Sequence, residues 1–181
     1  MQFIKTEIED VIIIEPKVHE DERGYFYESF RQDKLDEFLG YKINFIQDNE
    51  SKSSYGTLRG LHFQLPPQAQ TKLVRVIEGE VLDIAVDIRK NSPTFGKYIS
   101  LILSDKNRKQ LLIPHGFAHG FITLSNEAIF SYKVDNYYSP QHDRGIAYND
   151  PDIDINWMIT SDDIILSKKD KTQPLLKDFY E

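Results

Sequence analysis

The sequence predicts an all-β protein, built as a sandwich or barrel with a few short helices, and three observations favour this fold class. Short runs of apolar and β-branched residues recur at a spacing of roughly 8–12 residues, with turn-forming residues between them. In the run Val81–Ile88, alternate residues point to opposite faces, as in a strand. Helical signals are confined to one segment near residue 35 and to a turn or two around Ser161–Leu166. A jelly roll is one of the few arrangements for so many short strands, although the strand pattern alone does not choose among them.

The strand-like runs follow one another along the chain, separated by turn signals. They are Val11–Glu15, Gly24–Phe30, Leu73–Ile77, Val81–Ile88, Tyr98–Leu103, Gln110–Ile113, Gly120–Leu124 and Ala128–Val134. Leu73–Ile77 and Val81–Ile88 are predicted to pair as a hairpin, because only a short loop containing Gly79 separates them. Within the second run, Leu82, Ile84, Val86 and Ile88 are expected on one face, and Val81, Asp83, Ala85 and Asp87 on the other.

One helix is predicted in the first third of the chain. Asp33 is placed to cap its start, and Leu35, Phe38 and Leu39 form an apolar stripe. Gly40 suits the position just after the last helical turn.

The composition bounds the class of protein. A chain of 181 residues without repeats, low-complexity tracts or linkers fits one domain, expected to span residues 1–181. The formal net charge of −7 argues against general nucleic-acid binding, which needs a basic face, but leaves room for a small anionic ligand held by clustered Arg and Lys. The absence of cysteine removes disulfides, thiolate metal sites and cysteine nucleophiles.

The first residues argue against export and against membrane insertion. Acidic residues occur where a signal peptide would have an apolar run. The longest early apolar stretch, Val11–Ile14, is far shorter than the ~20 residues that span a bilayer. A cytoplasmic protein without membrane association is expected.

Several segments carry residues capable of chemistry. His62 lies in Leu58–Gln64, and it is either a core histidine bonded to backbone or a general base in a concave site. If that run is a regular strand, His62 and Arg59 lie on opposite faces, unless a glycine bends it. Lys72 and Arg75 are either solvated strand charges or ligands.

Further along the chain, the residues capable of chemistry also have a purely structural interpretation. His115 and His119 are spaced like metal ligands, but the proline and glycines around them disfavour the helix that would bring them together. Tyr132 lies in a strand, as do many packing tyrosines. The charged run Ser167–Lys171 is typical of a solvated turn.

Taken together, these segments resemble the dTDP-4-dehydrorhamnose 3,5-epimerase family, a branch of the cupins. The matching pieces are Asp21–Phe26, Phe45–Asn49, Leu58–Gln64, Lys72–Val76, Ile113–Phe121, Gly145-Ile146, Asn149–Pro151 and Leu166–Asp170. They follow the order of the family from about residue 10 to residue 175, so the resemblance covers nearly the whole chain. It implies a cupin-type jelly-roll barrel with an interior site, and a homodimer in which an N-terminal segment reaches the neighbour.

The resemblance also implies residue roles. His62 matches the general base, Asp170 the carboxylate that orients it, Tyr132 the general acid on the opposite face of the sugar, and Lys72 the residue near the C4 ketone. The positions that match contacts to the nucleotide, diphosphate or sugar are Arg23, Glu28, Gln47, Asn49, Arg59, His119, Asp143 and Lys168. Asp143 stands where many members have a glutamate, so its contact is carried over only weakly.

These residue types suit the implied chemistry. A proton next to a ketone is weakly acidic, so a base must remove it while a cation stabilises the enolate. A histidine held by a carboxylate supplies the base, and Lys72 supplies the cation. Inversion then needs a proton from the other face, which a tyrosine can donate. Arg23 and Arg59 suit a diphosphate, because a guanidinium can bond two oxygens at once.

The sequence predicts that no metal or organic cofactor is used. Gly56 and His62 keep the spacing of the first cupin metal motif, but Gln64 replaces the second histidine, and Gln68 and Ala69 stand at the glutamate positions. In the second motif His119 survives, but Thr123 stands where asparagine is usual. Two histidines without the remaining ligands make a poor transition-metal site.

The expected reaction is epimerisation at C3 and C5 of dTDP-4-keto-6-deoxy-D-glucose, giving dTDP-4-keto-L-rhamnose for dTDP-L-rhamnose biosynthesis. Alternatives are an epimerase that inverts only C3 or only C5 of a related 4-keto sugar nucleotide, a metal-dependent cupin, and a non-catalytic sugar-nucleotide binding module. The missing ligands disfavour the metal enzyme. The joint presence of His62, Asp170 and Tyr132 disfavours the binding module.

Overall fold

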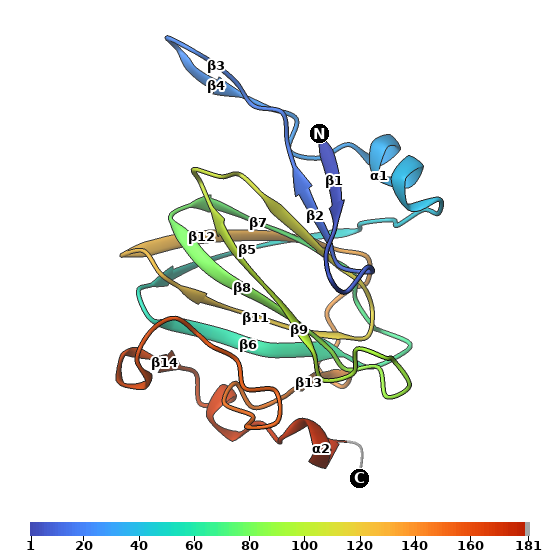
Figure 1. The fold of residues 1–181 in the computed structure, drawn as a ribbon, viewed down its shortest axis with the longest axis vertical. Coiled ribbons are helices and arrows are strands. Elements are labelled where there is room, and N and C mark those ends of the chain that lie inside the picture. The colour runs from blue at the N-terminus through green and yellow to red at the C-terminus, as the bar shows by residue number, and fades with distance from the viewer. Residues whose placement is uncertain (180–181) are drawn as a thin grey trace.

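The computed structural model describes residues 1–179 and consists mainly of two antiparallel β-sheets that face each other (Figure 1). Tyr180 and Glu181, the end of the domain expected over 1–181, lie outside the described residues. The first sheet has the strand order β1 (Gln2–Lys5), β2 (Ile12–Glu15), β10 (Gln110–Ile113), β7 (Lys72–Glu78), β12 (Glu127–Val134) and β5 (Gln47–Ser54). The second has the order β13 (Asp143–Gly145), β6 (Thr57–Gln64), β11 (Phe117–Thr123), β8 (Glu80–Asp87) and β9 (Tyr98–Ser104).

The remaining elements lie outside these two ladders. Strands β3 (His19–Asp21) and β4 (Gly24–Phe26) form a hairpin that projects away from the barrel (Figure 1). Strand β14 (Ile165–Leu166) pairs in parallel with β6. The helical elements are α1 (Gln32–Leu39), the 3₁₀ turns η1 (Ser161–Asp163) and η2 (Asp170–Thr172), and α2 (Leu176–Phe179). The all-β class is confirmed, as is the jelly-roll barrel that the resemblance implies.

Apolar clusters cover both faces of both sheets. Val74 and Phe130 of the first sheet meet Ala85 and Phe121 of the second in the barrel interior. The outer face of the second sheet packs against the C-terminal segment, which contributes Trp157. Helix α1 covers the outer face of the first sheet through its buried Leu35. Because both faces of each sheet are covered, the central strands consist largely of apolar residues.

Strand β8 shows how this packing places polar groups inside. Leu82, Ile84, Val86 and Ile88 belong to the outer cluster, and Val81 and Ala85 belong to the interior one, so the two predicted faces are confirmed. Asp83 and Asp87 alternate with the interior residues and are fully buried.

The predicted hairpin between Leu73–Ile77 and Val81–Ile88 is wrong. Strand β7 pairs with β10 and β12 in the first sheet, whereas β8 pairs with β11 and β9 in the second. The chain crosses between the sheets at Gly79, whose φ is +83° and where a Cβ would lie 2.1 Å from the Glu127 carbonyl oxygen. A short glycine loop is compatible with such a crossing as well as with a hairpin, and both strands find their partners elsewhere.

Other boundaries also differ from the expectation. Strand β4 ends at Phe26, and β11 begins at Phe117 rather than at Gly120. Helix α1 is present, and Gly40 ends it with a φ of +76°. Asp33 is not its cap: it lies in the first turn and forms an ion pair with Arg31, the N-cap residue. Among residues 1–179, no helix has the length and apolar character needed to cross a membrane.

Candidate active site

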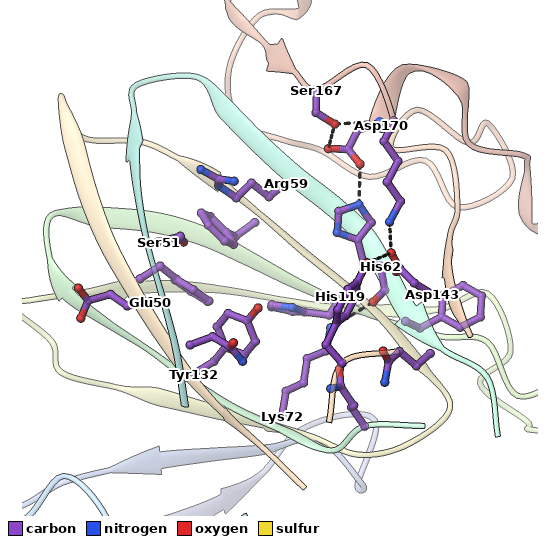
Figure 2. A pocket seen from close by; sticks show the side chains of 18 residues that line it. Glu50, Ser51, Arg59, His62, Lys72, His119, Tyr132, Asp143, Ser167 and Asp170 are labelled. Carbon is purple, nitrogen blue, oxygen red and sulfur yellow. Dashed lines mark hydrogen bonds and ion pairs between the residues drawn. The ribbon is translucent and has the colours of Figure 1, made fainter. Parts of the chain in front are cut away.

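A cavity of about 430 Å³ opens between the two sheets (Figure 2). One wall comes from the second sheet, with His62 and Arg59 on β6 and His119 on β11. The other comes from the first sheet, with Tyr132 on β12, Lys72 on β7, and Asn49, Glu50 and Ser51 on β5. The C-terminal segment closes the rim with Ser167, Lys169 and Asp170.

His62 and Asp170 form a hydrogen-bonded pair, although 108 positions separate them along the chain. The distance between His62 Nε2 and Asp170 Oδ1 is 2.5 Å. Strand β14 runs parallel to β6 just before Asp170, and this pairing brings the carboxylate to His62. Ser167 Oγ donates to Asp170 Oδ2 at 2.8 Å and accepts the Asp170 amide, so the carboxylate is held on both oxygens.

The electrostatics of this pair identify the basic nitrogen. Burial tends to raise the pKa of Asp170, but the hydrogen bonds from His62 and Ser167 and the charge of nearby Lys169 outweigh it and hold this pKa below its usual value. An ionised carboxylate can only accept, so Nε2 of His62 carries the proton of the short bond. In the neutral imidazole, Nδ1 then has the free lone pair that a general base requires.

A β-bulge places Arg59 on the same wall as His62. His62 lies opposite His119 and Arg59 lies opposite Phe121, so three steps along β6 match two steps along β11. Gly60 lies inside this irregularity with a φ of +146°, and an added Cβ would lie 2.5 Å from the Gly120 Cα. The glycine bend named as the exception in the sequence analysis is therefore present, and Arg59 lines the cavity.

Tyr132 lies across the cavity from His62 (Figure 2). Burial raises the pKa of its phenol, although the nearby Arg59 charge opposes this shift. The phenol is therefore protonated at neutral pH. The base and a proton donor thus come from opposite walls.

Lys72 and His119 lie deep in the cavity. Burial lowers the pKa of Lys72 to about 8, and its Nζ donates to the His62 carbonyl oxygen at 3.3 Å. His119 Nε2 bonds Asp83 Oδ2 at 2.9 Å. Burial lowers the pKa of His119 in spite of this carboxylate, so its imidazole is neutral near pH 7.

The rim of the cavity is polar, and its side chains form ion pairs and hydrogen bonds with one another or with nearby residues. Asp143 on β13 forms an ion pair with Lys169 and accepts a hydrogen bond from Tyr138 Oη at 3.0 Å. Arg59 Nε donates to Ser53 Oγ at 3.0 Å. These contacts place the cations Arg59 and Lys169 beside Asp143, and Glu50 also lines the cavity. The two cations suit an anionic ligand.

Four of the predicted site residues lie outside the cavity lining. Arg23 lies at the turn of the projecting hairpin, where it pairs with Asp21, and its side chain is 84% exposed. Glu28 follows the hairpin and pairs with Arg31. Gln47 begins β5 and donates to Asn49 Oδ1 at 2.8 Å. Lys168 is exposed, and its neighbour Lys169 lines the cavity instead.

Sequence reasoning missed three contributors to this arrangement. Ser167 and Lys169 lie in a run that is typical of a solvated turn, and nothing in its composition indicates that it folds over a cavity. The sequence does indicate a buried contact at Asp83, because a charged residue in an otherwise apolar strand needs a buried partner.

The position that replaces a metal-binding histidine has a structural role. Gln64 Nε2 donates to the Gln68 carbonyl oxygen at 2.6 Å, and its Oε1 accepts the Ser139 amide at 2.6 Å. Both ends of the side chain thus anchor loops. Within residues 1–179, no three His, Cys, Asp or Glu side chains are grouped as a metal site.

Comparison with known proteins decides the family. The family model described as dTDP-4-dehydrorhamnose 3,5-epimerase matches residues 5–178. This chain belongs to the dTDP-4-dehydrorhamnose 3,5-epimerase family. A member of that name from Shigella flexneri is 57% identical over 170 residues, which cover 94% of this chain and 93% of the relative.

Solved structures of family members agree with this assignment. The epimerase from Elizabethkingia anophelis has a TM-score of 0.94 and 52% identity, with coverage of 98% of this chain and 97% of the other. A Legionella pneumophila 3,5-epimerase in complex with dTDP-4-keto-L-rhamnose has a TM-score of 0.93 and 49% identity, with coverage of 97% and 93%. The epimerase family predicted from the ordered motifs is confirmed.

Proposed function

We propose that this chain epimerises C3 and C5 of dTDP-4-keto-6-deoxy-D-glucose to give dTDP-4-keto-L-rhamnose, as its family does. The observation that carries the proposal is the placement of a carboxylate-held histidine and a protonated tyrosine on opposite walls of one cavity. Epimerisation needs a base on one face of the ring and an acid on the other, and this pair supplies both.

The proposed steps balance as two proton transfers at each carbon. His62 Nδ1 removes the proton next to the ketone, the C–H electrons move into an enolate, and the ring becomes imidazolium beside Asp170. The Lys72 ammonium stabilises the oxygen of the enolate. Tyr132 then donates its proton to the opposite face of the same carbon. The imidazolium releases its proton to water and the tyrosinate takes one up, which restores both groups.

The cations at the cavity mouth are proposed to hold the diphosphate. Arg59 and Lys169 both line the cavity, and a guanidinium can bond two phosphate oxygens at once. Because Asp143 neutralises Lys169 in the described state, the diphosphate would compete with this carboxylate for the ammonium group. A substrate linked to dTDP fits this polar rim, with the keto sugar extending inward to His62.

We further propose that the enzyme is a cytoplasmic homodimer in which the β3–β4 hairpin of one protomer completes the site of its partner. The hairpin extends away from its own barrel and carries Tyr25 and Phe26, which are 56% and 69% exposed (Figure 1). Large apolar side chains on a projecting arm are typical of a contact with another subunit. Arg23 at its turn would then bind the nucleotide across the interface.

Proton NMR in D₂O tests the reaction directly. The purified enzyme is treated with a chelator and incubated with dTDP-4-keto-6-deoxy-D-glucose. Deuterium entering at both C3 and C5, with a reductase trapping an L-configured sugar, is the expected result. Exchange at one carbon only would reassign the chain to single-site epimerisation. No exchange, with the nucleotide still bound, would refute catalysis and support a binding module.

A further inference from the structure

Two residues that line the cavity, Lys72 and His119, are buried, and His119 bonds a buried aspartate behind the cavity wall that takes no part in the proton transfers. Lys72, Asp83 and His119 come from β7, β8 and β11, and they are 8%, 0% and 7% exposed. A charge removed from water is strongly disfavoured unless an opposite charge or hydrogen bonds compensate for it. The contacts within this group therefore determine which member is charged when a ketone binds.

Asp83 uses one of its two carboxylate oxygens for hydrogen bonding. Oδ2 bonds His119 Nε2, whereas Oδ1 is buried without a hydrogen-bond partner among residues 1–179. An orphan carboxylate oxygen in an apolar sheet is costly. Burial raises the pKa of Asp83, and the interaction with His119, followed by the charge of Lys72, opposes this rise. The charge of Asp83 in turn raises the pKa of Lys72.

The surroundings of Lys72 show why this carboxylate matters. Burial is the largest influence and lowers the Lys72 pKa, whereas the charge of Asp83, followed by that of Asp143, raises it, and Lys169 lowers it further. His62, His119 and Tyr132 line the same cavity. Asp143 already forms an ion pair with Lys169, which leaves Asp83 as the anion that mainly balances the ammonium group.

We propose that Asp83 is a positioning residue of the epimerisation: its carboxylate keeps Lys72 protonated beside the C4 ketone and fixes His119 as the Nε2–H tautomer. The inference rests on the proposed function of the cavity. Asp83 does not line the cavity and would act only through its two neighbours. Its charge also weakens the field that Lys72 exerts on the enolate, so its benefit lies in extending the pH range over which Lys72 is a cation.

The sign of the pH effect follows from this balance. The Lys72 ammonium is present below its pKa of about 8 and is lost above it. Asp83→Asn removes the negative charge but keeps an amide oxygen that accepts from His119. The variant should therefore lose catalysis at a lower pH than the wild type, while its rate at the acidic end of the range is retained.

The first experiment measures deuterium exchange at C3 and C5 as a function of pH. In Asp83→Asn, the midpoint of the basic limb is expected to shift to lower pH by at least about half a unit, equivalent to a threefold loss of protonated lysine above the midpoint. The matched control is Asp87→Asn, which removes another fully buried aspartate from the same face of β8, where it bonds Arg89 outside the cavity. The control should be less stable but have an unshifted limb. An equal loss of rate at every pH in Asp83→Asn would indicate a structural role and overturn the inference.

The second experiment does not depend on turnover. Nitrogen NMR of ¹⁵N-lysine-labelled protein follows the Lys72 ammonium without substrate, with Lys72→Met assigning the signal. A lower titration midpoint in Asp83→Asn supports the inference, and an unchanged midpoint overturns it. If the variant fails to fold, the Asp83 carboxyl carbon is followed in wild-type protein, where a protonated carboxyl at neutral pH would overturn the inference. Absence of exchange by the wild type would refute the proposed function, while the Lys72 titration would still decide the charge relation.

Discussion

At the scale of single residues, the hydrogen bond between His62 and Asp170 determines which nitrogen of the imidazole can contact a substrate. Nε2 is committed to a carboxylate that Ser167 also holds, so Nδ1 is the nitrogen available to a substrate. Tyr132, on the other wall, is kept protonated by burial. Tyr132 therefore begins the reaction in the protonation state that its proposed step requires.

Replacing His62 by Ala should abolish exchange at both C3 and C5 while leaving dTDP binding largely intact. Loss of a general base typically costs a factor on the order of 10²–10⁴ in rate. NMR exchange assays and titration calorimetry with dTDP measure the two effects. His115→Ala is the control, because that histidine pairs with Asp135 at the surface and does not line the cavity. Wild-type exchange in His62→Ala would remove the base assignment.

Replacing Tyr132 by Phe should damage net inversion more than proton abstraction, because the variant keeps the base and loses the donor on the opposite face. The ratio of deuterium wash-in to trapped L-sugar measures this difference, and it should rise by a factor on the order of 10 or more. Equal losses of exchange and inversion would count against the acid role.

The identity of candidate site residues was more accessible to sequence reasoning than the contacts between them. The resemblance to the family singled out His62, Asp170, Tyr132 and Lys72, and the structure gathers all four around one cavity. Nothing in the local sequence reveals that Lys169 faces Asp143 or that Ser167 holds Asp170, because both contacts depend on how the C-terminal segment folds over β6.

At the scale of elements, the bulge in β6 brings Arg59 and His62 onto one wall of the cavity. A regular strand would place Arg59 and His62 on opposite faces, and the extra residue at Gly60 rotates them onto one. Gly60 tolerates this conformation because it lacks a Cβ, which would lie 2.5 Å from the Gly120 Cα.

Gly60→Ala should therefore destabilise the protein by about 3 kcal/mol or more, from backbone strain and overpacking together. Thermal denaturation measures the loss. Gly40→Ala is the control, because that glycine also has a positive φ of +76° but nothing lies within 4 Å of an added Cβ. It should cost only about 1 kcal/mol. Equal costs at the two positions would show that the approach of β11 does not constrain Gly60.

Strands with runs of apolar residues were predictable, and polar ones were not. Gln110–Ile113 was predicted with the bounds that β10 has. Strand β5 (Gln47–Ser54) has almost no apolar residues and lies at the edge of its sheet, so it lacks the pattern that identifies a strand. The separation of β7 and β8 into different sheets is a property of long-range pairing that no local loop encodes.

At the scale of the whole molecule, the arginines predicted to contact the nucleotide do not lie together within one chain. Arg59 lines the cavity, whereas Arg23 extends on the hairpin far into solvent. A dimer that exchanges hairpins would unite them, because an isologous contact places the same arm over each partner site.

A mixing experiment tests this arrangement. Arg23→Ala and His62→Ala should each be poorly active alone, and co-refolded mixtures should recover ~25% of wild-type activity, since half of the dimers then contain one intact composite site. Light scattering verifies that the mixture is dimeric, and a mixture of His62→Ala with Tyr132→Phe is the control, because both positions belong to the same cavity. No recovery with Arg23→Ala would place Arg23 outside the partner's site.

The distance along the chain between His62 and Asp170 also bears on the timing of synthesis. The histidine leaves the ribosome more than a hundred residues before its carboxylate, and the strands that form the barrel walls are complete well before Ser167 is added. A nascent or prematurely terminated chain that ends before this point has the walls and the arginine of the mouth, but its imidazole has no fixed tautomer. Such a fragment is expected to lose exchange at both C3 and C5, because no carboxylate orients its general base.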